Sequence, residues 1–274
     1  MMKSLMRHSA MFFLRVFAGL AVMLLLFQSC MIYHPRGYEA SFIESRHAEP
    51  LRYTTSQGEQ VSWIRNPSGA GVVWLVFAGN GTRALDLVDY FERVPELQND
   101  VFVHVDYPAY GKCEGRPSPA AISESIQVML PTLATRLKVK PEALQTRLRV
   151  FGHSLGAAAA LIAMDEHNIH RGVLIAPFAS MMSMARLRVG WPLCELLHHR
   201  FDNEAAISRL QARGGCRLEV IHGTADEVIP QAQSADLAAK FPAIVTYHAV
   251  PGAFHNQILT SDRELVLKSM AAMR

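Results

Sequence analysis

The chain has 274 residues, half of them apolar, and a formal net charge of +3 at pH 7. This length fits one α/β domain with an N-terminal extension and argues against two full domains. Lys and Arg are dispersed, with no basic block beside aromatic residues, so we expect no nucleic-acid surface. The sequence contains no metal-binding CxxC or HExxH pattern and no Gly-rich nucleotide loop. We therefore expect no cofactor or metal, and chemistry carried by side chains alone.

Residues 1–30 have the pattern of an export or anchoring signal. Lys3 and Arg7 precede an apolar stretch, Ala10–Phe27, which only Arg15 interrupts and which Gln28-Ser29-Cys30 follows. A bacterial lipoprotein signal, an uncleaved signal anchor and a plain secretion signal all remain open. A resemblance to a lipobox favours the first and makes Cys30 the candidate lipidation site. We expect membrane association in a bacterial cell envelope, as a lipoprotein or through a single N-terminal anchor.

A polar connector, residues 31–50, leads into a domain that we place at 51–274. An antiparallel pair is expected to open it, and the later near-continuous apolar runs are typical of parallel strands covered on both faces. The eight expected strands are Leu51–Thr54, Val61–Arg65, Val72–Phe77, Val101–Asp106, Leu148–Phe151, Val173–Ala176, Leu218–His222 and Val245–Val250. The helices between and after them are expected at about Ala84–Leu97, Pro119–Leu137, Leu155–His167, Gln231–Lys240 and Arg263–Met273.

The segment Phe178–Gln211 is too long for a simple crossover between two strands. We interpret it as a small helical cap at about residues 178–211. Its Met and aromatic residues, among them Met181 and Trp191, would line an acyl-binding groove or would simply pack the cap onto the body. The sequence leaves both alternatives open.

Gly152-His153-Ser154-Leu155-Gly156 lies between an expected strand and an Ala-rich expected helix. This arrangement predicts a nucleophile elbow, in which a serine occupies a sharp strand-to-helix turn and glycines permit close backbone contact. The N-terminal end of the following helix would stabilise negative charge that develops beside Ser154.

A serine nucleophile needs a base and a carboxylate that orients the base. Asp226 follows the expected strand that ends at His222, and His255 follows the one that ends at Val250. Carboxyl ends of parallel strands converge on one rim, where Ser154 also emerges. We therefore expect Asp226 and His255 to complete the triad, with Asp165 and Asp202 as weaker competitors. His153 and His222 are expected to be structural, and His104 to be a core histidine with satisfied hydrogen bonds.

An oxyanion hole needs two backbone N–H donors, and Leu155 follows the nucleophile directly. The Gly-rich loop Phe77-Ala78-Gly79-Asn80-Gly81-Thr82 follows the third expected strand and can turn sharply at the rim. We predict the N–H of Asn80 as the second donor.

From about residue 50 to the end, several short sequence motifs together make a specific resemblance to a known family. The chain resembles the α/β-hydrolases, and among them the membrane-anchored serine hydrolases grouped with serine aminopeptidase-like and protein-depalmitoylating enzymes. The motifs are Phe77 to Gly81, Asp106 to Gly115, Gly152 to Gly156, Arg200-Phe201-Asp202, His222 to Asp226 and Gly252 to Asn256. The resemblance implies an α/β-hydrolase fold, a mostly parallel eight-stranded sheet with helices on both faces and a small cap. It also implies Ser154 as nucleophile, Asp226 as orienting acid, His255 as base, and Asn80 and Leu155 as amide donors.

These observations predict a membrane-tethered serine hydrolase of carboxylic esters or thioesters that forms an acyl-serine intermediate. The expected substrate is a small-molecule or lipid-like ester, and the sequence leaves the oligomeric state undetermined. An acyltransferase with the same triad and a non-catalytic binding protein on a hydrolase fold are the alternatives.

Overall fold

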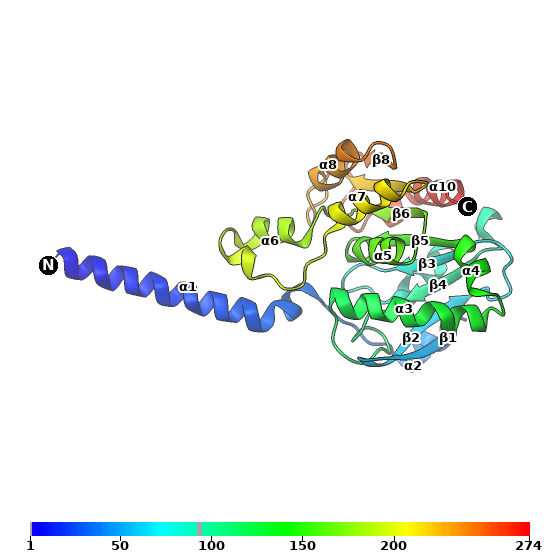
Figure 1. Cartoon of the computed structure of the whole chain (residues 1–274), viewed down its shortest axis with the longest axis horizontal. Coiled ribbons are helices and arrows are strands. Elements are labelled where there is room, and N and C mark those ends of the chain that lie inside the picture. The colour runs from blue at the N-terminus through cyan, green and yellow to red at the C-terminus, as the bar shows by residue number, and fades with distance from the viewer. Residues whose placement is uncertain (1, 92–94) are drawn as a thin grey trace.

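The computed structural model describes residues 2–91 and 95–274, and within them one sheet of eight strands forms the centre of the molecule (Figure 1). The strand order is β1-β2-β4-β3-β5-β6-β7-β8. The first three strands in this order pair antiparallel and all later pairs are parallel. The strands are β1 Glu49–Thr55, β2 Gly58–Arg65, β3 Val73–Phe77, β4 Val101–Val105, β5 Leu148–His153, β6 Arg171–Ile175, β7 Arg217–Gly223 and β8 Val245–Val250. The predicted fold class is confirmed.

Helices cover both faces of the sheet, which explains why β3 and β4 are apolar and buried at almost every position. One face packs against α3 (Pro119–Arg136), α4 (Pro141–Arg147), α5 (Leu155–Glu166), α7 (Asn203–Arg213) and α8 (Ala232–Lys240). The other face packs against the 3₁₀-helix η1 (Ala84–Tyr90), α9 (Ile258–Ser261) and α10 (Arg263–Ala272). Because helices bury the central strands on both faces, the carboxyl ends of β3 and of β5 to β8 are held at one rim of the sheet.

The segment expected to be a single helix over Ala84–Leu97 differs in the structure. Its described residues form two 3₁₀-helices, η1 and η2 (Pro95–Leu97), and residues 92–94 lie outside the described part. Asp86 accepts a hydrogen bond from the backbone N–H of Arg83 at 3.0 Å and pairs with the Arg83 guanidinium at 2.7 Å. These local bonds favour a tight turn at the start of η1 over a continuing α-helix.

The segment expected to be a cap contains α6 (Met181–Val189), the 3₁₀-helix η3 (Leu193–Leu196) and α7. Apolar residues of α7 join the core beside α5, so α7 belongs to the helical layer on the sheet. We use the word cap below for residues 181–196, which comprise α6 and η3. The cap lies beyond the sheet, near the end of α1 (Met2–Ile32), and α1 projects away from the body (Figure 1). The short helix α2 (Ala40–Ser45) precedes β1.

Gly156, in the first turn of α5, allows that helix to approach the sheet more closely than another residue would. A Cβ at Gly156 would lie 2.1 Å from the carbonyl oxygen of Phe77 and 2.6 Å from that of Ala78. Both are backbone atoms of β3 or of the loop directly after it, so they cannot move aside without displacing the strand end.

We expect Gly156→Ala to destabilise the protein by about 3 kcal/mol, because overpacking against backbone forces α5 and β3 apart. Thermal denaturation followed by circular dichroism measures the change. Gly37→Ala is the matched control, since its nearest non-local atom would lie 3.8 Å from the new Cβ, in ordinary contact. Equal melting temperatures for the two variants would contradict this account of the close approach.

His104 of β4 is fully buried, and neither ring nitrogen has a hydrogen-bond partner among the described residues. The expectation of a satisfied core histidine was therefore correct on burial and wrong on hydrogen bonding. Its ring lies 5.9 Å from that of Phe91 and 6.4 Å from that of Phe102, so its surroundings are aromatic. Burial, helped by the positive charge of Arg65, lowers the pKa of His104 to about 3.

A His104 pKa below the ordinary value of about 6.5 means that the folded state binds fewer protons than the unfolded state at intermediate pH. The contribution of this pKa difference to the free energy of unfolding is complete above pH 6.5 and declines as the pH falls toward 3. Between pH 7 and pH 4.5, we expect the free energy of unfolding to fall by about 2–3 kcal/mol less in His104→Phe than in wild type. Urea denaturation at both pH values tests this, and parallel losses in the two proteins would refute it.

Candidate active site

Ser154 occupies the turn between β5 and α5 with a strained backbone. Its φ is 56° and its ψ is −118°, and non-glycine residues rarely adopt such a positive φ. The turn is held on one side because the Ser154 N–H donates to the carbonyl of Ile175 at 2.8 Å. A Cβ at Gly152 would lie 2.3 Å from the carbonyl oxygen of Gly156, so this elbow also requires glycine before the serine.

Asp226 and His255 lie together at the same rim, although they are far apart in the sequence. Asp226 follows β7 and His255 follows β8, which pair in parallel so that their carboxyl ends are adjacent. His255 Nδ1 lies 2.7 Å from Asp226 Oδ2, a hydrogen bond in the tautomer that carries its hydrogen on Nδ1. The backbone N–H of His255 also donates to Glu227 Oε2 at 3.1 Å. This geometry leaves Nε2 as the nitrogen able to accept a proton.

Asp226 is surrounded by donors from its own loop and from β7. The N–H groups of Val228 and Ile229 both donate to Oδ1 at 2.8 Å, and His222 Nε2 lies 3.0 Å from Oδ2. Burial by itself would raise the pKa of Asp226, but the hydrogen bonds from His222, His255 and Ile229 outweigh it and hold the pKa below its usual value. The carboxylate is thus ionised throughout the neutral and mildly acidic range.

His222 contacts the candidate triad directly, which the sequence did not indicate. The side chain is completely buried, its Nδ1 lies 2.6 Å from the Ser234 hydroxyl and its Nε2 lies 3.0 Å from the Ile229 carbonyl. The only signal in the sequence for this role was its position, one residue before the end of the strand that leads into the loop with Asp226. Its Nε2 also contacts Asp226 Oδ2, the same oxygen that His255 Nδ1 contacts.

His153 connects the nucleophile turn with the base. Its ring centroid lies 5.0 Å from that of His255, and its Nε2 lies 3.3 Å from the His255 carbonyl oxygen. Burial, together with the charge of His255, lowers the pKa of His153 to about 4, so this ring is neutral at neutral pH. Among the described contacts no hydrogen bond joins Ser154 Oγ to His255, a common looseness in sites without substrate.

The two predicted oxyanion donors lie beside Ser154. Asn80 and Leu155 line the same cavity as Ser154, and in the described part of the chain neither backbone N–H has an acceptor. The Asn80 side chain instead holds its loop in place. Its Oδ1 accepts from the Tyr110 hydroxyl at 2.7 Å, and its Nδ2 donates to the carbonyl of Ile32 at 2.7 Å. The loop after β3 is therefore bonded to the end of α1.

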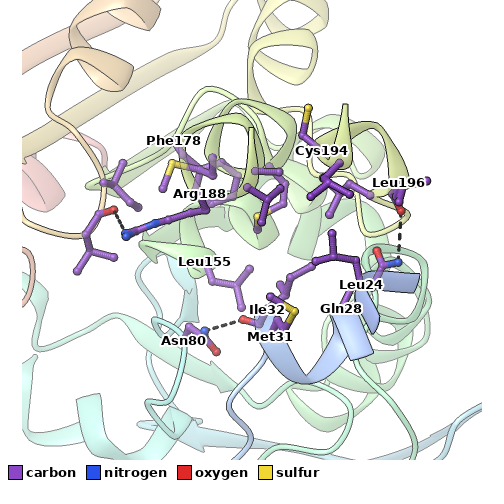
Figure 2. A pocket seen from close by; sticks show the side chains of 18 of the residues that line it. Leu24, Gln28, Met31, Ile32, Asn80, Leu155, Phe178, Arg188, Cys194 and Leu196 are labelled. Atoms are coloured by element: carbon purple, nitrogen blue, oxygen red, sulfur yellow. Dashed lines mark hydrogen bonds between the residues drawn. The ribbon is translucent and has the colours of Figure 1, made fainter. Parts of the chain in front are cut away.

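The cavity next to Ser154 has a volume of about 390 Å³ and a mainly apolar lining (Figure 2). Its walls come from the end of α1, from the cap and from the loop after β7. The lining side chains include Leu24, Met31, Ile32, Phe178, Met181, Met184, Val189, Leu193, Leu197 and Val228. Volume and character match the pockets that bind small apolar ligands, typically about 300–1,000 Å³.

The other candidate residues lie elsewhere. Asp202 caps α7 by accepting from the N–H of Ala205 at 3.0 Å, and Asp165 pairs with Arg209 at 2.7 Å. Both are thus structural and do not compete with Asp226. Cys30 is an exposed free thiol on α1. Within residues 2–91 and 95–274, no three His, Cys, Asp or Glu side chains are grouped so as to hold a metal ion.

The chain is similar to known proteins over much of its length. An uncharacterized protein of Mycobacterium tuberculosis is 29% identical over 166 residues, which cover 60% of this chain and 56% of that protein. Alpha/beta hydrolase domain-containing protein 17C of Xenopus laevis is 25% identical over 212 residues, 77% of this chain and 65% of that protein. The chain thus spans less than two thirds of the length of both relatives.

Among solved structures, an esterase of Pyrococcus furiosus superposes with a TM-score of 0.64 at 14% identity. The match covers 88% of this chain and 96% of the esterase, so the likeness extends over the whole fold. The model of the alpha/beta hydrolase family matches residues 69–272, from just before β3 to the last helix. With sheet order, elbow and family model in agreement, the chain belongs to the alpha/beta hydrolase family.

Proposed function

We propose that the protein is a serine hydrolase that cleaves carboxylic esters or thioesters through an acyl-Ser154 intermediate. The observation that carries this proposal is the 2.7 Å bond between His255 Nδ1 and Asp226 Oδ2, at the rim where Ser154 has its strained turn. A buried imidazole oriented by an ionised carboxylate is the arrangement needed to activate a serine hydroxyl.

In the acylation step, Ser154 Oγ attacks the substrate carbonyl carbon while His255 Nε2 takes the hydroxyl proton. The tetrahedral oxyanion is stabilised by the N–H groups of Asn80 and Leu155 and by the start of α5. When the intermediate collapses, the bond to the alcohol or thiol breaks, and that leaving group takes the proton from His255. A water molecule, deprotonated by His255, then attacks the acyl-serine; the bond to Ser154 Oγ breaks, His255 returns the proton to Oγ, and the acid is released.

The ionised Asp226 stabilises the imidazolium that forms in each half of this cycle. Because its pKa is held below the usual value, acidification to about pH 5 leaves Asp226 charged. The neutral ring of His153, beside His255, adds no competing positive charge at neutral pH. A charged Asp226 therefore faces the base throughout this pH range.

The cavity supports esters with apolar acyl groups as substrates. Its lining is mainly aliphatic and methionine side chains, which would bind an acyl chain by burial of apolar surface. The esterase fold of the Pyrococcus furiosus neighbour is consistent with this substrate class. Helix α1 would hold the enzyme at a membrane, since Leu14–Ile32 has a mean hydropathy of 1.9 and is long enough to cross one.

We expect a fluorophosphonate probe to label the full chain, and Ser154→Ala or His255→Ala to abolish labelling. With p-nitrophenyl butyrate, Ser154→Ala should lower kcat by about 10⁴-fold or more, because the nucleophile is removed. Ser261→Ala, at an exposed serine far along the chain, is the control and should label as wild type does. A folded wild-type chain that neither labels nor hydrolyses the ester would exclude the proposed chemistry.

We expect His222→Gln to lower kcat about tenfold with little change in KM, because one hydrogen bond to the buried carboxylate is weakened or lost. Its control is His248→Gln, since His248 pairs with Glu219 on the neighbouring strand and does not contact Asp226. Steady-state kinetics and melting temperatures of both variants separate a positioning effect from a loss of stability. If the two variants have equal kcat values, His222 only fills space behind the triad.

A further inference from the structure

The end of α1 forms one wall of the cavity at Ser154. Leu24, Gln28, Met31 and Ile32 all line it, and spacings of four (Leu24 to Gln28 to Ile32) and three (Gln28 to Met31) place them on one face of the helix (Figure 2). The opposite wall is the cap. The end of α1 and the cap, which are separated by roughly 150 residues of sequence, thus enclose the same space.

Gln28 bonds this wall to the cap. Its side chain is only 7% exposed, although it lies in a helix whose other side chains are mostly apolar and exposed. Its Oε1 accepts from the backbone N–H of His198 at 2.7 Å, and its Nε2 donates to the carbonyl of Leu196 at 3.4 Å (Figure 2). A buried amide is tolerated because both of its ends are bonded.

Two further contacts hold the end of α1 in place. The Tyr33 hydroxyl lies 3.2 Å from His199 Nδ1, and the two rings meet edge to face at 5.4 Å. Asn80, the predicted oxyanion residue, bonds the carbonyl of Ile32 through its side chain. The helix end is therefore attached both to the cap and to the loop beside the nucleophile.

The other side of α1 is apolar and uncovered, and so is the tip of the cap. On α1, Val22 and Leu26 are 54% and 70% exposed, and on the cap side Leu187 and Trp191 are 60% and 81% exposed. Tryptophan exposed to this degree is uncommon in water but typical of the interface of a bilayer. One helix thus presents its cavity-lining face to Ser154 and its opposite face to the surroundings.

We propose that the last turns of α1 are a functional part of the acyl pocket, and that long acyl chains of bilayer-resident esters enter laterally between α1 and the cap. This rests on the proposed serine hydrolase function. It requires that the chain keep residues 1–30, because removal of the segment before Cys30 would delete Leu24 and Gln28 from the pocket. Of the alternatives left open by the sequence, it selects the uncleaved anchor.

The test uses the full chain reconstituted in vesicles of phosphatidylcholine and phosphatidylglycerol. The readout is the ratio of kcat/KM for p-nitrophenyl palmitate to that for p-nitrophenyl butyrate. We expect Leu24→Trp to lower this ratio at least about tenfold, because the larger ring takes up pocket space that a long acyl chain needs and a short one does not. Leu26→Trp, on the exposed face of the same helix, is the matched control and should keep the wild-type ratio.

A second variant, Gln28→Leu, tests the bonds that hold the wall. Without them we expect the same ratio to fall at least about threefold. Sedimentation with vesicles shows that each variant is inserted, and the intact mass of the membrane-purified wild type shows whether residues 1–30 are retained.

Unchanged ratios in both inserted variants, or a mature chain that begins at a lipidated Cys30, would overturn the inference. If butyrate hydrolysis through Ser154 persists in that case, the proposed function stands without it. A wild-type chain that hydrolyses neither ester and does not react with a fluorophosphonate would overturn both.

Discussion

The close contact between the first turn of α5 and the ends of β3 and β5 is the constraint on which the site depends. Gly156 and Gly152 permit it, because a Cβ on either would lie within 2.3 Å of a backbone carbonyl oxygen. The chain can therefore reverse direction at Ser154, whose φ of 56° is the strain that this reversal requires. The well-packed sheet around it supports that strain, and the same contact sets the position of the Leu155 N–H relative to the loop after β3.

The buried carboxylate of Asp226 is a second constraint, and it is electrostatic. A carboxylate so placed would be protonated if burial alone acted on it, but two backbone N–H groups and two imidazoles bond to it. The charge is thus kept where an imidazolium can form beside it. His222 on β7 and His255 in the loop after β8 contact the same oxygen, so the orientation of the base depends on the pairing of β7 with β8.

The sequence predicted the sheet well, because a strand buried on both faces must be apolar throughout, as β3 is. It also placed Ser154, Asp226 and His255 at one rim, because parallel strands fix where the loops after them lie. It did not predict that Gln28 bonds to His198 and to Leu196, interactions between residues 170 and 168 positions apart that leave no local pattern. The sequence also predicted one helix from Ala84 onward, which was wrong, because the spacing of apolar residues carries no information on the local hydrogen bonds of Asp86. Contacts between distant segments are settled by packing, and composition or periodicity does not encode them.

The bond between Asn80 and the carbonyl of Ile32 has a mechanical consequence. A domain attached to its anchor by a long flexible linker would sample many orientations. Here the connection between the helix and the domain is hydrogen-bonded to Asn80 at residues 32–34. A chain whose helix crossed a bilayer would carry its nucleophile at one fixed height and tilt relative to the lipid headgroups. It would then find substrates by diffusing in two dimensions, so its rate would follow their surface density and not their bulk concentration.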